Sequence, residues 1–444
     1  MERYILRDLQ EWKQKSGRKP LILKGVRQTG KTTILKQFGA NCFQRVHYVN
    51  FEQNQKLATL FEGDFEPRRI LTDLRFILGT DIDVTQDLLI FDEIQACPVA
   101  LTSLKYFAEQ LPELALCCAG SLLGLYLSEA SFPVGKVDFL SMRPMCFAEF
   151  LAANQDEAAL SVLNQCRLGD SVSETIHAHL WEQFKIYLVT GGLPEVVQTY
   201  IDHKDNRYRA FTLVRQKQNE LIYGYYADIA KHSGKVNAMQ IDRLWRAIPS
   251  QLAQSQDGSS QRFQFKGIVP GIDRYQRLAS VIDWLLAAEL IIKVPCVSHV
   301  ELPLSAYTEV SHFKLYLFDI GILAALSDLS AQSIMDYDYG TYKGYCAENF
   351  IAQELLMKHQ APLYSWQDTR SEIEFLFVKD NAVIPLEVKS GWVTRNQSLN
   401  KYAEKYHPPY RVTFSGKPLM IDELHQYHRY PLYMAYWFPL GFTQ

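Results

Sequence analysis

Residues 25–32, GVRQTGKT, have the glycine and lysine spacing of a loop that binds phosphate groups. An apolar run at 21–23 precedes this loop, and a helix-forming run, TILKQF, follows it. Glycines let consecutive N–H groups turn toward phosphate oxygens, and the helix N-terminus adds its dipole. Lys31 would reach the β- and γ-phosphates, and Thr32 would offer a hydroxyl to Mg²⁺. The residues predicted to surround the nucleotide are Gly25, Arg27, Gln28, Thr29, Gly30, Lys31, Thr32 and Thr33.

A second segment, DLLIFDE at 87–93, indicates the same chemistry. Continuous apolar runs are typical of buried parallel strands, whose C-terminal ends carry ligand sites. Asp92 would complete the Mg²⁺ shell, and Glu93 would polarise the attacking water. A further strand at 114–119 leads to Ser121, a predicted γ-phosphate sensor. The alternative, a glycine-rich turn that happens to end in Lys-Thr, leaves the paired carboxylates unexplained, so the pattern predicts binding and hydrolysis of ATP or GTP.

A second group of charged residues lies within apolar, strand-like runs at 372–391, EIEFLFVKDNAVIPLEVKSG. If Asp380 and Asn381 form a two-residue turn, positions whose numbers sum to 761 lie opposite each other. Glu374 then faces Glu387, and Glu372 faces Lys389, all on one side of the hairpin. The other side is apolar and is predicted to belong to the core.

Two opposed carboxylates about 5 Å apart repel each other unless a proton or a cation lies between them. A divalent ion bound by Glu374 and Glu387 is one answer, with Lys389 beside the metal-bound water. Glu348 shares its predicted helix face with apolar residues, and it is either a further ligand or an acid favoured by the helix dipole. The alternative is a surface hairpin with an exposed pair between Glu372 and Lys389.

The elements that must position these residues belong to a chain of 444 residues, which suggests two to four domains. Apolar residues make up 48% and the net charge is −3, so any contact with nucleic acid must be local. The charged N-terminus argues against a secretory signal, and no run of about 18 apolar residues indicates a membrane span. Eight cysteines without a CxxC pair suggest buried thiols in a reduced, cytoplasmic protein.

Four segments together resemble the prokaryotic AAA-type ATP-binding proteins that carry a restriction-endonuclease-like C-terminal domain. They are GVRQTGKTT, LLIFDEIQ, CAGSLLGL and FLSMRPMCFAEFL. The resemblance implies an α/β fold with an AAA-type P-loop ATPase domain built on a parallel sheet at 1–155. It also implies a helical segment at 156–235, a winged-helix-like domain at 236–335 and an α/β domain like the PD-(D/E)xK nucleases at 336–444. Glu348, Glu374, Glu387 and Lys389 match that nuclease core, with Glu387 and Lys389 catalytic and the three glutamates as Mg²⁺ ligands.

Two positions depart from the family pattern. Lys136 stands where these proteins usually carry an arginine, so it would stabilise transition-state charge without the bidentate fork of a guanidinium. Glu374 stands where the nuclease core usually has Asp, and the longer side chain loosens a Mg²⁺ site. Both departures favour a protein that responds to nucleotide without cutting a polymer.

The middle of the chain contains fewer residue patterns that indicate a chemical function. His177 and His179 lie two residues apart on a predicted helix, so they occupy different faces and a metal pair is not expected. Three helices and two strands at 236–330 suggest a winged helix, whose helix near 273–288 would enter a DNA groove. That helix offers Arg274 and Arg277 but is otherwise mostly apolar, which favours packing over DNA reading.

Two functions remain open at the level of sequence. In the first, ATP hydrolysis gates Mg²⁺-dependent cleavage of DNA or RNA. In the second, nucleotide state controls the recognition of a protein or nucleic-acid partner that is not cut. The expected cofactors are ATP and Mg²⁺, the expected partners include DNA or RNA but no membrane, and AAA-type rings make a homo-oligomer a further expectation.

Overall fold

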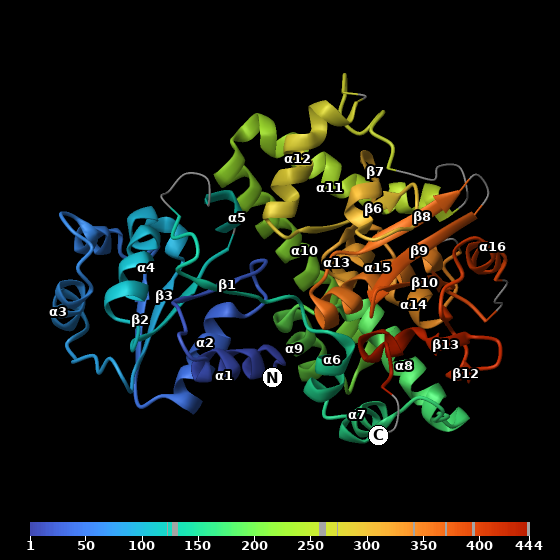
Figure 1. Cartoon of the computed structure of the whole chain (residues 1–444), viewed down its shortest axis with the longest axis horizontal. Coiled ribbons are helices and arrows are strands. Elements are labelled where there is room, and N and C mark those ends of the chain that lie inside the picture. The colour runs from blue at the N-terminus through green and yellow to red at the C-terminus, as the bar shows by residue number, and fades with distance from the viewer. Residues whose placement is uncertain are drawn as a thin grey trace. The chain divides into compact units, whose positions relative to one another are not determined.

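The computed structural model describes residues 1–121, 123–126, 132–256, 263–272, 274–340, 342–368, 371–392 and 396–441 (Figure 1). The chain divides into two units by its internal contacts. Glu2–Arg143 and Ala287–Glu289 form the N-terminal unit, whereas Pro144–Leu286 and Leu290–Gln444 form the C-terminal unit. Within the described ranges, no helix is long and apolar enough to cross a bilayer.

The N-terminal unit is built on a five-stranded sheet in the order β2-β3-β4-β1-β5, and every neighbouring pair is parallel. Its strands are β1 (Leu21–Lys24), β2 (Val46–Asn50), β3 (Leu88–Asp92), β4 (Ala115–Ala119) and β5 (Asp138–Ser141). Its helices are α1 (Ile5–Gln14), α2 (Lys31–Cys42), α3 (Pro67–Leu78), α4 (Pro98–Gln110) and the short α5 (Leu123–Tyr126), with 3₁₀ turns η1 (Gln55–Phe61) and η2 (Ile94–Ala96). Strands β3 and β4 are buried along their whole length, as their continuous apolar sequences predict.

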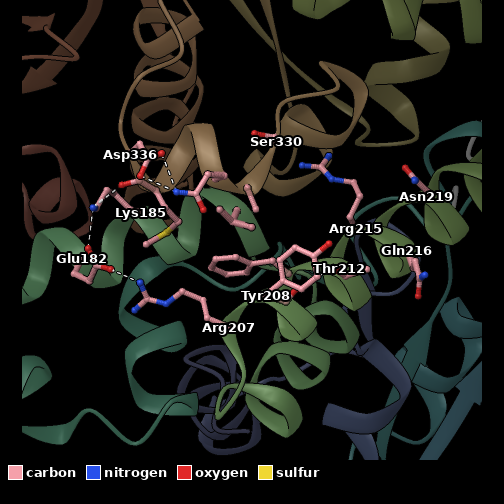
Figure 2. Close-up of a pocket in the computed structure, with 15 residues that line it drawn as sticks. Glu182, Lys185, Arg207, Tyr208, Thr212, Arg215, Gln216, Asn219, Ser330 and Asp336 are labelled. Carbon is pink, nitrogen blue, oxygen red and sulfur yellow. Dashed lines mark hydrogen bonds and ion pairs between the residues drawn. The ribbon is translucent and has the colours of Figure 1, made fainter.

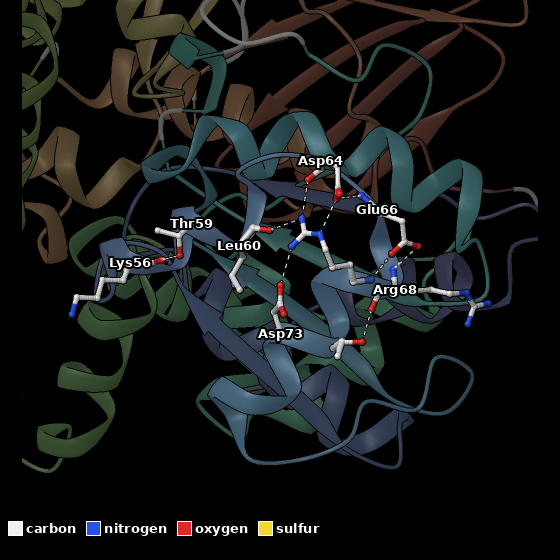
Figure 3. A network of polar contacts seen from close by, with 9 residues as sticks. Lys56, Thr59, Leu60, Asp64, Glu66, Arg68 and Asp73 are labelled. Atoms are coloured by element: carbon white, nitrogen blue, oxygen red, sulfur yellow. Dashed lines mark hydrogen bonds and ion pairs between the residues drawn. The ribbon is translucent and has the colours of Figure 1, made fainter.

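Arg69 fixes the segment that joins η1 to α3 (Figure 3). Its guanidinium donates to Asp64 Oδ1 at 2.8 Å, to Asp73 Oδ2 at 2.9 Å and to the Leu60 carbonyl oxygen at 3.1 Å. The Glu66 side chain accepts from the first backbone N–H groups of α3 and caps that helix. These contacts fix the conformation of the polar segment between η1 and α3, which is part of the connection from β2 to β3.

The C-terminal unit contains an eight-stranded mixed sheet in the order β12-β13-β11-β10-β9-β8-β6-β7. Its strands are β6 (Ile291–Val297), β7 (Thr308–Leu317), β8 (Tyr364–Asp368), β9 (Ser371–Lys379), β10 (Ala382–Val388), β11 (Arg411–Ser415), β12 (Met420–Asp422) and β13 (Tyr427–Pro431). Its helices are α6 (Phe147–Ala153), α7 (Glu157–Gln165), α8 (Glu174–Thr190), α9 (Pro194–His203), α10 (Arg207–Ser233), α11 (Lys235–Gln256), α12 (Tyr275–Ala287), α13 (Ile320–Leu326), α14 (Ala331–Met335), α15 (Tyr342–His359) and α16 (Gln397–Tyr406), with 3₁₀ turns η3 (Leu304–Tyr307) and η4 (Leu432–Trp437).

The predicted boundary near residue 335 does not separate two sheets. Strands β6 and β7 form the hairpin expected of a winged helix, but β6 also pairs in parallel with β8. The hairpin is therefore the edge of the same sheet that carries β9 and β10. Helix α12 buries the apolar face formed by Leu278, Val281, Ile282 and Leu285, which agrees with a packing role. Residue 273, at the start of the predicted helix, lies outside the described residues.

Helix α15 is buried on most of its surface and uses polar side chains to satisfy neighbouring backbone groups. Asn349 exchanges two hydrogen bonds with Leu317, at 2.7 and 3.0 Å. Gln353 accepts from the Ile320 backbone N–H at 3.0 Å, and Glu354 accepts from that of Phe147 at 3.0 Å. Because α6 is tied to α15 in this way, the N-terminal unit ends at Arg143, before the predicted boundary at 155.

Candidate functional site: a phosphate loop and a carboxylate cluster

The loop between β1 and α2 has the backbone conformation that its glycines allow. Gly25 has a φ of 150°, and a Cβ atom at this position would meet the Met142 carbonyl oxygen at 2.2 Å. Gly30 has a φ of 91° and is the N-cap residue of α2. The loop therefore approaches the chain after β5 closely and then turns into the helix, as the predicted phosphate loop requires.

The Lys31 side chain donates hydrogen bonds to the backbone of its own loop. Its ammonium donates to the carbonyl oxygens of Gly25 at 2.8 Å and Val26 at 2.9 Å, and its side chain is buried. Burial lowers the pKa of Lys31 to about 8, although nearby carboxylates, Glu93 foremost, act in the opposite direction. The loop thus holds a desolvated cation that a triphosphate would stabilise in its charged form.

Asp92 lies at the C-terminal end of β3 and joins the loop to the sheet. Its Oδ2 accepts from the Thr32 hydroxyl at 2.9 Å and from the Tyr48 hydroxyl at 2.6 Å. The oxygen atoms of Thr32 and Asp92 are the hard ligands that Mg²⁺ prefers, and they lie within one hydrogen bond of each other. The predicted Mg²⁺ ligands of the nucleotide site therefore fit that ion.

The remaining predicted residues follow at the same edge of the sheet. Glu93 has a φ of 50°, is partly exposed and is held by the Gln95 side-chain amide. Ser121 follows β4, and its hydroxyl accepts from Arg27 Nε at 3.0 Å. Gln28 and Thr33 are exposed, whereas Thr29 is buried with its hydroxyl on the Val26 carbonyl oxygen at 2.9 Å.

Two residues that contact this site were missed by the sequence reasoning. Arg3 donates to the Thr29 carbonyl oxygen at 2.9 Å and to that of Arg143 at 2.6 Å, so it braces the phosphate loop. Tyr48 lies on β2 opposite Ile90 of β3, two positions before Asp92. The two-residue period of a parallel pair is the signal that could have found Tyr48 once β2 was known to neighbour β3. No local pattern marks Arg3.

Lys136 lies at the other edge of the sheet. Asp138 pairs with Leu21 at the start of β1, so Lys136 precedes the N-terminal edge, whereas the phosphate loop follows the C-terminal edge. Lys136 forms an ion pair with Glu109 of α4 at 2.8 Å. Within one subunit, Lys136 is therefore not placed to stabilise charge at the phosphates.

The hairpin of β9 and β10 has the predicted register. Ala382 pairs with Lys379 and Leu386 with Phe375, so paired numbers sum to 761, and Glu387 and Glu374 come next in that register. Asp380 and Asn381 both have positive φ, at 50° and 60°, as a two-residue turn of this kind requires. Ile373, Phe375, Ile384 and Leu386 are buried, which confirms the predicted core face.

Lys314 of β7 forms ion pairs with two glutamates, one of which is the predicted metal ligand Glu348. Its ammonium lies 3.2 Å from Glu348 Oε2 and also contacts Glu372 Oε1. The Tyr316 hydroxyl donates to the same Glu348 oxygen at 2.6 Å. The alternative, an exposed ion pair between Glu372 and Lys389, is not formed, because Lys314 holds Glu372 and Lys389 lies 2.8 Å from Glu387 Oε1.

Glu374 and Glu387 lie beside this ion pair. Burial, followed by the charge of Glu348, raises the pKa of Glu374 to about 8, and Glu374 Oε2 accepts from the Val388 backbone N–H at 3.0 Å. Burial also raises the pKa of Glu387, whose Oε2 has no hydrogen-bond partner among the described residues. The structure thus brings all four predicted residues of this site into one cluster, and a proton on Glu374 relieves the repulsion.

This carboxylate cluster (Glu348, Glu372, Glu374 and Glu387) does not fit the predicted Mg²⁺ ion. Across the described ranges, no group of three or more His, Cys, Asp or Glu side chains is arranged to hold a metal. One physical reason is that Glu348, one of the three predicted ligands, already forms an ion pair with the Lys314 ammonium, which also contacts Glu372. His177 and His179 are also apart, as predicted: His177 is buried against the Tyr433 hydroxyl at 2.7 Å, whereas His179 is exposed and contacts Asp156 at 2.6 Å.

A parallel sheet with a phosphate loop after β1 and a Mg²⁺-type carboxylate after β3 is the architecture of P-loop ATPase domains. Residues 17–151 match a family model described as an AAA domain, so this part of the chain is an AAA-type P-loop ATPase domain. Residues 181–333 and 343–433 match two models described as domains of unknown function, DUF8612 and DUF4143.

Solved structures similar to the chain include a Walker-type ATPase of Pyrococcus abyssi, with 18% identity, a TM-score of 0.44 and coverage of 72% of this chain and 94% of that one. The Aeropyrum pernix ORC1 protein in complex with DNA has 14% identity, a TM-score of 0.26 and coverage of 74% and 93%. Drosophila ORC bound to DNA has 14% identity, a TM-score of 0.24 and coverage of 76% and 95%. Among curated proteins, none matches the chain.

Proposed function

We propose that the protein binds ATP with Mg²⁺ in its N-terminal unit and hydrolyses the γ-phosphate bond. The observation that carries the proposal is the 2.9 Å contact between the Thr32 hydroxyl and Asp92 beside a buried lysine. Mg²⁺, when bound with the triphosphate, offsets charge on the phosphate oxygens. Lys31 contributes a second positive charge, the loop N–H groups bind the phosphates, and Glu93 orients the attacking water.

The test is ATP turnover by the full chain. We expect Lys31→Ala to lose nucleotide affinity, and Glu93→Gln to bind ATP normally while turnover falls by two orders of magnitude or more. Gln86→Glu, an exposed change just before β3, is the matched control and should leave both quantities unchanged. Normal turnover in Lys31→Ala would overturn the proposal.

For the C-terminal unit, we propose a PD-(D/E)xK nuclease-type fold that recognises a partner without cutting it. Support comes from the register that joins Glu374 to Glu387 and from Lys314, which takes the position of a cation beside Glu348. A retained fold can bind a polymer after its catalytic site has been lost. DNA or RNA is the proposed partner, and nucleotide state would control how it is bound.

Mg²⁺-dependent cleavage of that polymer is the competing function. Incubation of the full chain with single- and double-stranded DNA and RNA, with ATP and Mg²⁺ or Mn²⁺, separates the two. We expect binding or a change in ATP turnover without cleavage. Cleavage that disappears in a Glu387→Ala, Lys389→Ala double variant would establish the nuclease instead.

We also propose that the protein forms a homo-oligomer. Because Lys136 is remote from the phosphates of its own subunit, a cation in the role expected of Lys136 would come from a neighbouring subunit. Native mass measurement with ATP and Mg²⁺ tests this directly. We also propose a reducing, cytoplasmic setting, since no disulfide joins any of the eight cysteines, all of which lie in the described ranges.

A further inference from the structure

A cavity of about 970 Å³ lies in the C-terminal unit and shares no residue with the phosphate loop or the carboxylate cluster (Figure 2). Helix α8 lines it with Lys185 and Val189, helix α10 with Phe211 and Arg215, and helix α14 with Met335. Its volume is at the upper end of the range typical of small-molecule sites. The proposed function makes no use of this space.

The charged residues at one end of the cavity neutralise each other. Glu182 accepts from Lys185 and from Arg207, each at 2.8 Å, and Lys185 also donates to the Met335 carbonyl oxygen at 2.7 Å. Gln332 donates to both oxygens of Asp336, at 2.8 and 2.9 Å. The charged groups at this end therefore already have partners within the chain.

Arg215 lies at the opposite end, as Figure 2 shows, and no described carboxylate is in direct contact with its guanidinium. Its Nη2 donates to the Leu329 carbonyl oxygen at 2.7 Å, and its Nη1 has no hydrogen-bond partner in the described part of the chain. Burial lowers the pKa of Arg215, and the charge of Asp328 acts in the opposite direction without a direct contact. The side chain is half-buried, so a charge without a direct ion pair costs more than it would in open solvent.

The space next to Arg215 combines polar and apolar groups. Gln216 and Asn219 follow Arg215 along α10 and lie at its end of the cavity in Figure 2. Tyr208, Phe211 and Met335 also line the cavity, with two aromatic rings and a flexible thioether chain. A guanidinium with amides beside it suits a carboxylate or a phosphate, and aromatic walls suit a planar ring.

We propose that this cavity binds a small organic anion, with its carboxylate or phosphate on Arg215 and a planar apolar body between Tyr208, Phe211 and Met335. The anion supplies the direct ion pair that Arg215 does not form with any described carboxylate, and its body covers the exposed ring of Tyr208. The proposal is independent of the nucleotide site, because none of the residues that line the cavity belongs to the N-terminal unit.

The first experiment uses an anionic aromatic probe, 8-anilinonaphthalene-1-sulfonate, with the nucleotide site saturated by ATP. We expect one site whose affinity falls about tenfold in Arg215→Gln, the loss typical of one charge-assisted hydrogen bond. Arg209→Gln is the matched control, since it removes the same charge from an exposed position on α10 outside the cavity. Equal effects of both variants, or no binding by the wild-type chain, would overturn the proposal.

A second pair of measurements keeps the test decisive if Arg215→Gln folds poorly. N-phenyl-1-naphthylamine has the same rings without the sulfonate, and we expect it to bind the wild-type chain about tenfold more weakly. Tyr208→Ala changes an 85% exposed side chain, so the fold should persist while probe affinity falls several-fold. Equal affinity for the two probes, or no effect of Tyr208→Ala, would contradict the assigned binding mode.

Competition then separates the two sources of the anion. Benzoate and phenyl phosphate carry the same ring, and displacement of the probe by either supports the site. Stronger displacement by phenyl phosphate would assign a phosphorylated ligand, and stronger displacement by benzoate a carboxylate. Failure of both compounds to displace the probe would overturn the anion site.

Discussion

The Lys314 ammonium lies 3.2 Å from Glu348 Oε2, and both side chains are buried. Burial alone would lower the pKa of Lys314, but Glu348 and Glu372 outweigh it and raise that pKa well above its ordinary value. The ammonium is therefore charged at every physiological pH. It places a positive charge beside Glu348, one of the three glutamates that the sequence pattern assigned to Mg²⁺.

Removing Lys314 should destabilise the fold and open the cluster to a metal. Lys314→Ala leaves Glu348 and Glu372 without their cation, and breaking a buried ion pair in this way costs about 3–5 kcal/mol. We expect a lower melting temperature that Mn²⁺ partly restores in the variant but not in the wild-type chain.

The matched control for this experiment is Lys405→Ala. Lys405 forms an exposed ion pair with Asp368 at 3.2 Å, and such pairs contribute about 0–1 kcal/mol. The melting temperature of the Lys405→Ala protein should be close to that of wild type and should not change with Mn²⁺. A Lys314→Ala protein as stable as this control would show that the Lys314 ammonium does not stabilise the cluster.

Glu374 should make stability depend on pH. Its pKa is about 8 in the folded chain, against an ordinary value of 4.5, so the folded state keeps a proton that the unfolded state loses between these values. The contribution of Glu374 therefore becomes less favourable as pH rises from 4.5 to 8 and is constant above that. Urea unfolding of wild type and Glu374→Gln at several pH values should show the variant gaining relative stability across this window.

Glu404→Gln, on the exposed side of α16, provides the comparison for Glu374→Gln. We expect the difference between this variant and wild type to stay constant from pH 5.5 to 8.5. A flat difference for Glu374→Gln as well would mean that the Glu374 carboxyl is ionised at neutral pH, contrary to the geometry of the cluster.

Sequence spacing predicts the parts of this protein that depend on neighbouring residues. The phosphate loop and the carboxylates after β3 need only a strand, a turn and a helix in order, and both are found where expected. The register of β9 and β10 follows from a two-residue turn, so the approach of Glu374 to Glu387 was also predictable.

Long-range contacts explain what the sequence did not predict. Lys314 reaches Glu348 and Glu372 only because β6 and β7 join the same sheet as β9, and no local pattern encodes that pairing. Arg3 contacts Thr29 and Arg143 from a position before α1, at a separation that spacing arguments do not cover. The metal site was predicted from residues of the right type, but one of them, Glu348, is paired with Lys314 from a strand that the pattern left outside the site.

Nucleotide binding should take up protons near pH 8. Lys31 has a pKa of about 8 in the folded chain, so it is mostly charged at pH 7 and mostly neutral at pH 9. A bound triphosphate favours the charged form and raises that pKa, so ATP affinity should fall above pH 8 by up to about tenfold per pH unit. Calorimetry in two buffers of different ionisation enthalpy measures the proton uptake, and Lys31→Arg, whose guanidinium stays charged, should show none at this step.

Arg3 should set the conformation of the phosphate loop. Its two hydrogen bonds to the Thr29 and Arg143 carbonyl oxygens are lost in Arg3→Ala, and charged hydrogen bonds contribute about 1.5–3 kcal/mol each. We expect ATP affinity to fall about tenfold or more. Arg7→Ala, one turn further along α1 and exposed, should bind ATP normally. Equal affinity in the two variants would show that the loop holds its conformation without Arg3.

Lys136 should not affect ATP turnover within a single subunit. The four residues of β1 span about 13 Å, and Lys136 lies before the sheet edge opposite the phosphates, too far for direct contact. Lys136→Arg, which restores the fork of a guanidinium, should therefore leave turnover unchanged at protein concentrations where the chain is monomeric by native mass. If a neighbouring subunit receives this side chain, the variant should raise turnover only at concentrations where oligomers form. A gain that is independent of protein concentration would contradict the placement of Lys136 at the far edge of the sheet.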